Sequence, residues 1–382
     1  MTGSVRVALR SAWQAVPVLP EVRIAAADQP LTGRWAQQPV TPPGQTMLGI
    51  SFRPLQAAAL GLDPAVVLAQ LLPYPFPLIR LAAYWRQLEP APDRVDMSGL
   101  DAQIEAATAA GKKIILCLGA VKSFGYPEFF VPAHHLPEPL PEGRLIGPLS
   151  HPRLLAGATE FLTRVVERYR EHPAIVAWQV EHEPVDPLGM EHSWRLAADF
   201  VGQEVAAVRA VDPGRPVLLT GFLPTSLPVR LQQRWRTRDQ GDSLAVACQL
   251  ADIVGLNVYP RHGLVRVGPR TAYLAGSRSL WQRRASSRLC AEAARDGRRL
   301  MVTEGQAEPW ETVTTPPSHP GRAMFSCLPE HIIDNYNAAM PLGQAAPGGL
   351  WAYLFWGAEY WVKRSQQGDD SYLAAFERVL SG

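Results

Sequence analysis

Eight short apolar segments recur along the 382-residue chain, and most of them precede a segment with helical periodicity. Strands that alternate with helices predict a parallel sheet. Eight such strands predict closure of that sheet, so we expect a single α/β domain with the (β/α)8 architecture of a TIM barrel. The predicted strands are residues 47–50, 77–81, 112–118, 173–177, 216–220, 252–257, 299–303 and 349–355.

The clearest helical pattern follows Ser150, which we interpret as an N-cap. From Leu154 to Val166 the apolar residues recur at the spacing of one helix face. Asp63 before Pro64 marks another helix start, because proline is well tolerated at the first helical position after a capping aspartate. Further helices are predicted at residues 98–110, 194–211, 280–295 and 372–380.

The regions outside this repeat are an N-terminal extension and two long loops. Residues 1–45 are irregular and become rich in proline, so we expect an extension that packs beneath a barrel domain formed by residues 46–382. The loops are residues 119–148, after the third strand, and 306–327, after the seventh. Loops of this length in a compact domain are usually functional, and the first is expected to wall one side of a cleft.

Charge and cysteine usage exclude several function classes. The chain has 37 basic and 35 acidic residues without a like-charge run, which argues against nucleic acid or an anionic membrane as a partner. No apolar run approaches the roughly 18 residues of a membrane helix, and residues 1–30 lack a clear signal peptide, so we expect a cytoplasmic protein. The four cysteines are scattered, which predicts buried thiols without a metal or redox role.

Two glutamates stand at the ends of predicted strands. Glu183 precedes Pro184 after the fourth strand, and Glu304 ends the seventh. In a barrel of this kind the carboxyl ends of the strands meet at one face, so both side chains should enter one cleft. A single glutamate at a strand end is more often a helix cap or an ion-pair partner. Two of them at one rim favour glycosidic bond cleavage, which in retaining enzymes needs two carboxyl groups about 5–5.5 Å apart.

The sequence around these glutamates resembles the clan-A retaining glycoside hydrolases, a group that includes cellulases, mannanases and β-galactosidases. The resemblance covers roughly residues 46–380 and does not single out one substrate family. The motifs that carry it are Ile79-Arg-Leu81 with Tyr84-Trp85 and Glu89-Pro90, Trp178 to Pro184, Asn257-Val-Tyr259, Thr303-Glu304, and Leu354-Phe-Trp356-Gly357.

The resemblance implies a role for each matching residue. Glu183 would be the acid/base and Glu304 the nucleophile. Arg80 and Tyr259 would form hydrogen bonds near the nucleophile, and a cation such as Arg80 also favours the ionised form of a neighbouring carboxylate. Trp356 would be the platform under the sugar at the cleavage point. The implied partner is a carbohydrate, and no cofactor is required.

Four positions depart from that pattern or need a separate interpretation. His182 stands where the clan usually has asparagine, which contacts the sugar 2-hydroxyl; histidine also donates a hydrogen bond but is bulkier and can titrate. Trp310, in the loop after the seventh strand, either lines the cleft or anchors the loop. His134 and His135 lack a third ligand at metal spacing, so they are predicted to be solvated loop residues, and no metal is assigned.

Other functions remain open at this point. His182 is compatible with a carbohydrate-binding barrel of weakened or lost catalysis. A transglycosidase would use the same two carboxylates but pass the sugar to an acceptor other than water. An unrelated barrel enzyme, such as an aldolase or isomerase, would need a catalytic lysine or a metal cluster at the strand ends, and the sequence suggests neither. The sugar, the linkage, internal or terminal cleavage and the oligomeric state stay undetermined.

Overall fold

The computed structural model describes most of the chain. The described residues are 22–26, 28–92, 94–136, 138–186, 192–224, 227, 230–231, 234–235, 242–267, 270–275, 287–289, 291–293, 295–313, 316–344 and 349–382.

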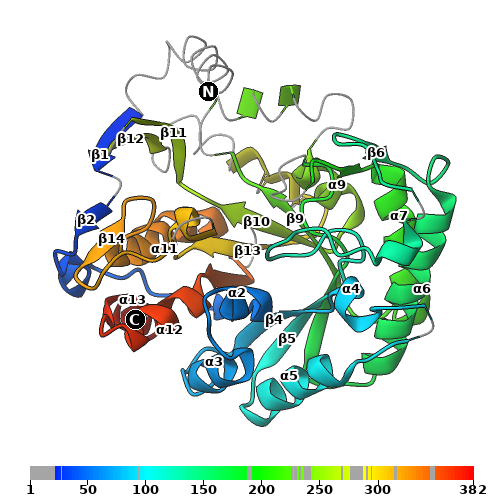
Figure 1. Ribbon diagram of the computed structural model, residues 1–382, viewed down its shortest axis with the longest axis horizontal. Coiled ribbons are helices and arrows are strands. Elements are labelled where there is room, and N and C mark those ends of the chain that lie inside the picture. Colours follow the sequence, from blue (N-terminus) through cyan, green and yellow to red (C-terminus); the bar gives the residue numbers. More distant parts are fainter. Residues whose placement is uncertain are drawn as a thin grey trace.

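The core is a closed barrel of eight parallel strands, with helices around it (Figure 1). The strands are β3 (Met47–Ser51), β4 (Leu78–Ala82), β5 (Lys113–Cys117), β7 (Ile175–Gln179), β9 (Val217–Phe222), β10 (Ile253–Val258), β13 (Arg299–Gln306) and β15 (Ala352–Trp356). Neighbours around the barrel follow in chain order, and β15 closes it by pairing with β3. The predicted (β/α)8 barrel and all eight of its strands are therefore confirmed.

The strands are apolar along their length because both of their faces are covered. Leu78, Ile115 and Met301 belong to the cluster that fills the barrel interior. The alternate residues, such as Ile79 and Ile114, pack instead against the surrounding helices. Full burial of each such side chain contributes roughly 1.5–3 kcal/mol, so the barrel is a rigid support for the residues at its rim.

Most of the predicted helices are present, with differences at some boundaries. The helices are α2 (Pro54–Ala59), α3 (Pro64–Leu71), α4 (Trp85–Leu88), α5 (Ser98–Ala109), α6 (Pro152–Tyr169), α7 (Ala198–Val211), α9 (Ser243–Leu250), α11 (Pro329–Gln344), α12 (Ala358–Gln366) and α13 (Ser371–Leu380). Of these, α2, α4, α9, α11 and α12 were not predicted from the sequence. The predicted cap at Ser150 is wrong: His151 occupies the cap position, and the Ser150 hydroxyl contacts Gly147 instead. Most of the helix predicted at 280–295 lies outside the described residues.

A second boundary differs because backbone pairing overrides the helical pattern. The helix predicted from residue 194 begins at Ala198, since β8 (Arg195–Leu196) pairs with β6 (Leu145–Ile146) in the loop after β5. This short pairing joins the loops that follow β5 and β7.

The N-terminal segment is more ordered than predicted. The strand β1 (Val22–Ala26) pairs with β12 (Arg270–Ala275), which also pairs with β11 (Arg261–Val267), and β2 (Asp28–Pro30) pairs with β14 (Arg322–Met324) (Figure 1). These partners follow β10 and β13, at the rim formed by the carboxyl ends of the strands. The expectation that this part is irregular and packs beneath the barrel is therefore wrong for residues 22–30, and residues 1–21 lie outside the described part.

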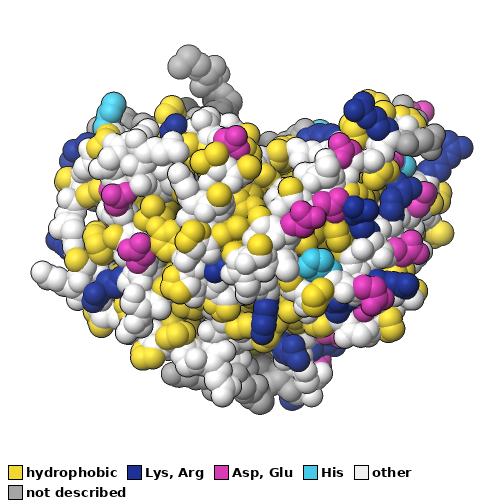
Figure 2. Space-filling model, turned by 90° about the horizontal axis from the view of Figure 1, so that it is seen from below, with side chains coloured by type: hydrophobic (Ala, Val, Ile, Leu, Met, Phe, Trp, Pro, Cys, Tyr) yellow, Lys and Arg dark blue, Asp and Glu magenta, His cyan; other side chains and the backbone are white. Residues whose placement is uncertain are grey.

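The surface carries charges of both signs. On the face in Figure 2, basic and acidic side chains are interspersed, most densely on the right, where α6 and α7 lie in Figure 1. Among the described helices, none is long and apolar enough to cross a membrane. The thiols of Cys117, Cys248 and Cys327 are free and buried as predicted, whereas Cys290 lies outside the described residues.

Candidate active site

Glu304 lies in β13, near its carboxyl end, with a donor on each of its carboxylate oxygens. The Arg80 guanidinium, from β4, donates from Nη2 to Oε1 at 2.9 Å. The Tyr259 hydroxyl, just after β10, donates to Oε2 at 2.6 Å. Burial, and then the charge of Glu304, raises the pKa of Tyr259 well above its ordinary value, so the phenol keeps the proton that it donates. The contacts expected of Arg80 and Tyr259 are thus present.

The position of Arg80 is fixed by its other contacts. It is fully buried, where an unpaired charge would be strongly destabilising. Its Nε donates to the Ser51 hydroxyl at 2.9 Å and its Nη1 to Gln179 Oε1 at 3.2 Å. The ring of Phe124, from the loop after β5, lies 3.9 Å from the guanidinium carbon. Three strands and this loop therefore aim the cation at Glu304.

Glu183 follows β7 and has an unusual backbone conformation. Its φ is 42°, in the left-handed region that residues other than glycine rarely adopt. Its backbone amide donates to the Thr220 hydroxyl at 3.2 Å, and its carbonyl accepts from Lys122 Nζ at 2.7 Å. Non-glycine residues held in such conformations are concentrated at functional sites. The strain at Glu183 agrees with a side chain that must point in one particular direction.

The Glu183 carboxyl has a different environment from that of Glu304. Asn257 Nδ2 donates to its Oε1 at 2.7 Å, and Thr303 Oγ1 fixes the same amide by donating to Asn257 Oδ1 at 2.7 Å. In the β10–β13 register Asn257 is paired with Glu304, so this one residue links the two glutamates. Burial, then the negative charges of Asp186 and Glu304, raises the pKa of Glu183 well above its ordinary value.

His182 lies beside Glu304, and its surroundings favour the neutral imidazole. Its side chain is almost fully buried, with Nδ1 at 3.2 Å from the Thr220 hydroxyl and 3.6 Å from Glu304 Oε1. Burial, and then the positive charges of Arg80 and Lys122, lowers the pKa of His182 well below its ordinary value. The structure therefore does not support titration of His182 in the physiological range. The side chain is still bulkier than the asparagine that the clan usually has at this position.

The two tryptophans occupy different positions. Trp356, at the end of β15, is 5% exposed; the Arg53 guanidinium lies 4.2 Å from its ring and the Phe124 ring 6.0 Å away. Its neighbours include Arg80, so it belongs to the site, and its role as a sugar platform stays a prediction. Trp310 begins the short helix η5 (Trp310–Val313) and is 39% exposed. No contact described for Trp310 connects it to either glutamate.

Some residues of the site were not assigned a role from the sequence. They are Asn257, Lys122 and Glu128, the last in the loop after β5. Burial, and then the charges of Glu304 and Asp186, raises the pKa of Glu128 to about 7. The Pro- and aromatic-rich composition of that loop indicated a cleft wall but did not distinguish this carboxyl. The environment of the Glu128 carboxyl depends on residues distant in sequence, and no sequence motif indicates those neighbours.

If strand alternation continued past β7, Glu181 would face the same side as Glu183 but one layer deeper, and the structure places it elsewhere. It accepts hydrogen bonds from the backbone amides of Val121 and Lys122, at 3.0 and 2.7 Å, and it interacts with Glu204 of α7. The strand ends at Gln179, and the left-handed residue Glu183 breaks the alternation. Burial raises the pKa of Glu181 to about 7.

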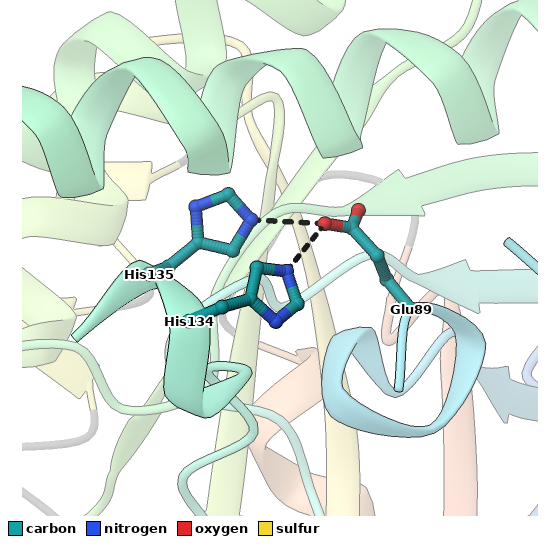
Figure 3. A group of neighbouring side chains, drawn as sticks. All are labelled: Glu89, His134 and His135. Atoms are coloured by element: carbon teal, nitrogen blue, oxygen red, sulfur yellow. Dashed lines mark hydrogen bonds and ion pairs between the residues drawn. The ribbon is translucent and has the colours of Figure 1, made fainter. Parts of the chain in front are cut away.

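The histidine pair also differs from the prediction. Glu89, four residues after the start of α4, lies beside His134 and His135 (Figure 3). The atoms of these three side chains that could bind a metal ion all lie within 4.8 Å of one another. The expectation that these histidines lack a third potential ligand is therefore wrong, because a loop distant in sequence supplies it.

Comparison with known proteins gives one family. Residues 78–201 match the model of the Glyco_hydro_42 family, described as β-galactosidase. A β-galactosidase from Arthrobacter sp. is 32% identical over 133 residues, which are 32% of this chain and 17% of that protein. The chain thus matches about a sixth of the length of this relative. The family match includes Arg80 and Glu183 but ends before Glu304.

Solved structures share the barrel at low sequence identity. A GH5_18 protein from Streptomyces cattleya in complex with GlcNAc has a TM-score of 0.56 and 14% identity, with 88% of this chain and 80% of that chain covered. Native xylanase 10B from Thermotoga maritima has a TM-score of 0.54 and 12% identity, covering 88% and 95%. The chain therefore shares the barrel fold of these glycoside hydrolase structures and is similar in sequence to β-galactosidases over part of its length.

Proposed function

We propose that the protein is a retaining glycoside hydrolase with Glu304 as nucleophile and Glu183 as acid/base. The observation that carries the proposal is the contrast between the two carboxyl groups. Both oxygens of Glu304 accept hydrogen bonds, one from a guanidinium, which suits an anion. The raised pKa of Glu183 suits a proton donor near neutral pH.

The reaction follows from this assignment in two steps. In the first, a carboxylate oxygen of Glu304 attacks the anomeric carbon while Glu183 gives its proton to the departing glycosidic oxygen. In the second, Glu183, now a carboxylate, takes a proton from water, and the water oxygen displaces Glu304 from the sugar. The enzyme returns to its starting protonation state, and no group outside the chain is consumed except water.

For the substrate, we propose a β-linked glycoside, with β-galactosides as the first to assay. The matched family and the Arthrobacter relative are both described as β-galactosidases. A GH5_18 variant from Bifidobacterium longum, with a TM-score of 0.57 and 12% identity, was solved with a β-linked disaccharide, Manβ1-4GlcNAc. A panel of aryl β-glycosides that differ in the sugar is therefore the appropriate screen.

The decisive experiment replaces the nucleophile and then supplies another one. Glu304→Ala should lower turnover of aryl glycosides by about 10⁴-fold or more, because no covalent intermediate can form. Added azide should restore turnover of a substrate with a good leaving group and give a glycosyl azide of inverted anomeric configuration. Turnover that survives the substitution unchanged would remove Glu304 from the mechanism.

A catalytically weakened sugar-binding barrel is the second candidate, and His182 is the observation that favours it. Its ring stands 3.6 Å from Glu304, in the place where the clan usually has an asparagine. Binding of sugars without turnover across the whole aryl glycoside panel would support this candidate. Transfer to an added acceptor sugar, seen in the products, would instead indicate a transglycosidase.

A further inference from the structure

The cluster of Glu89, His134 and His135 joins two loops, and none of the contacts described for it involves Glu183 or Glu304. Glu89 follows α4 in the loop after β4, whereas the histidines are in the short helix η3 (Ala133–His135) in the loop after β5. Both imidazoles turn Nε2 towards the same oxygen, Oε1 of Glu89, each at 2.9 Å (Figure 3). Three potential metal ligands, two imidazole nitrogens and one carboxylate oxygen, therefore lie together, although Glu89 and His134 are 45 residues apart in the sequence.

The surroundings hold these groups in place. The other carboxylate oxygen of Glu89, Oε2, accepts from Trp85 Nε1 at 3.2 Å and from Arg164 Nη1 at 3.4 Å, which leaves Oε1 to the histidines. The His135 ring lies 4.4 Å from the Trp85 ring. It also lies against Gly157 of α6, where an added Cβ would come within 2.6 Å of Nδ1.

Such supporting contacts are typical of metal sites. Carboxylate ligands are usually hydrogen-bonded through the oxygen that does not bind the ion, as Oε2 is here. The positive charge of Arg164 opposes a nearby cation, but its other partner, Glu160, accepts from Arg164 Nη2 at 2.8 Å and offsets that charge.

We propose that Glu89, His134 and His135 form a binding site for Zn²⁺ or a similar divalent transition metal. Two imidazole nitrogens and one carboxylate oxygen are a common zinc ligand set, and a water molecule completes the tetrahedron in sites with three protein ligands. The side chains of the three residues are 11–24% exposed, so solvent can reach the site.

The ligand atoms now lie within 4.8 Å of one another and have to adjust to accept the ion. Ligands about 2.0–2.1 Å from a tetrahedral metal lie roughly 3.3–3.5 Å from one another. Each nitrogen is now 2.9 Å from Oε1, so it has to move back by a few tenths of an ångström. Each imidazole then carries its proton on Nδ1 and offers the Nε2 lone pair to the metal.

The role that follows is structural. The ion would fasten the loop after β5 to the loop after β4, and the former carries Phe124, which packs on Arg80. It would touch no reacting atom, and this inference does not depend on the proposed hydrolysis.

Metal binding by the full chain tests the site directly. After removal of metal with a chelator, titration with Co²⁺ should give visible d–d absorption that saturates near one equivalent, and Zn²⁺ should abolish it. Zn²⁺ at about 100 times its dissociation constant should raise the Tm by about 3 °C. Glu89→Gln and His134→Asn should each weaken Co²⁺ binding by about 10- to 100-fold.

Glu142→Gln is the matched control, because Glu142, in the same loop as His134 and His135, forms a carboxylate–histidine pair at 2.7 Å with His192 of the loop after β7. This variant should bind Co²⁺ as the original protein does. The proposal is overturned if the original protein shows no saturable Co²⁺ absorption, or if neither Glu89→Gln nor His134→Asn weakens it; the cluster is then a hydrogen-bonded group only. Both readouts are taken without substrate, so they stand whether or not the protein proves to be a glycosidase.

Discussion

The charged groups next to Glu304 and those next to Glu183 have opposite signs. Glu304 receives hydrogen bonds on both oxygens, one of them from the buried cation Arg80. Glu183 receives a hydrogen bond from a neutral amide, Asn257, and has the negative charges of Asp186 and Glu304 beside it. The same residue type thus stands in one environment that favours the anion and in another that favours the neutral acid.

The division of roles therefore depends on the neighbours of each glutamate rather than on the glutamates themselves. Arg80 comes from β4, Asn257 from β10 and Glu304 from β13, and each is fixed by contacts with residues of other strands or loops. Exchanging or removing a neighbour should therefore change one carboxyl group and leave the other largely intact. The following tests are ordered by the size of the expected effect.

The largest effect is expected from Glu183→Gln. For substrates with poor leaving groups, kcat/KM should fall by about 10²- to 10⁴-fold, because no proton reaches the departing oxygen. For substrates with good leaving groups it should change little. In the original enzyme, kcat/KM with a poor leaving group should also fall as pH rises through the raised pKa of Glu183, since the carboxyl loses the proton that it must donate. This fall of kcat/KM at high pH, the alkaline limb of the profile, should disappear in Glu183→Gln. Profiles of kcat/KM against pH, recorded for a series of leaving groups, measure both the leaving-group dependence and the alkaline limb.

Glu128 is the rival acid in this test, because its carboxyl also has a raised pKa, about 7. In Glu128→Gln, kcat/KM should still depend only weakly on the leaving group and should still fall as pH rises. If Glu128→Gln abolishes the limb while Glu183→Gln retains it, the roles assigned to these two residues are reversed.

A smaller effect is expected from Tyr259→Phe, which removes one donor from Glu304 and leaves the ring. A hydrogen bond to a charged group contributes about 1.5–3 kcal/mol, so kcat/KM should fall by roughly 10- to 100-fold. Tyr336→Phe is the matched control, because that hydroxyl bonds to the Thr41 carbonyl beside α11. Equal losses in the two variants would show a general effect of tyrosine truncation rather than a role at Glu304.

The smallest effect concerns the buried acids behind the site. Burial, and then the charge of Glu181, raises the pKa of Glu204 well above its ordinary value. A carboxyl with a raised folded-state pKa contributes stability that is fully present below its unfolded pKa and is lost as pH rises through the folded one. Glu204→Gln should therefore reduce the loss of stability as pH rises above about 4.3, the pKa of an unperturbed glutamate.

Urea unfolding at several pH values measures this slope. Glu105→Gln, at an exposed position of α5, is the control and should leave the slope as it is. A slope in Glu204→Gln that equals that of the original protein would mean that Glu204 does not ionise in this range.

Several features of the site could be predicted from particular residues. Glu183 and Glu304 stand beside strand ends, and Arg80 and Tyr259 lie in short motifs, so barrel geometry alone brings them to one rim. The alternation rule failed at Glu181, because the strand ends two residues before it and Glu183 adopts a left-handed conformation. The cap at Ser150 failed because its hydroxyl found a local partner, Gly147.

The sequence by itself determined the barrel, because eight apolar strands with helices between them can bury both of their faces in few other ways. Tertiary structure decided which neighbours surround each carboxyl group. Asn257 reaches Glu183 across 74 residues, and Glu89 reaches His134 across 45. Periodicity records which face of an element is buried, whereas hydrogen bonds and charges act between residues that only the closed barrel and its loops bring together.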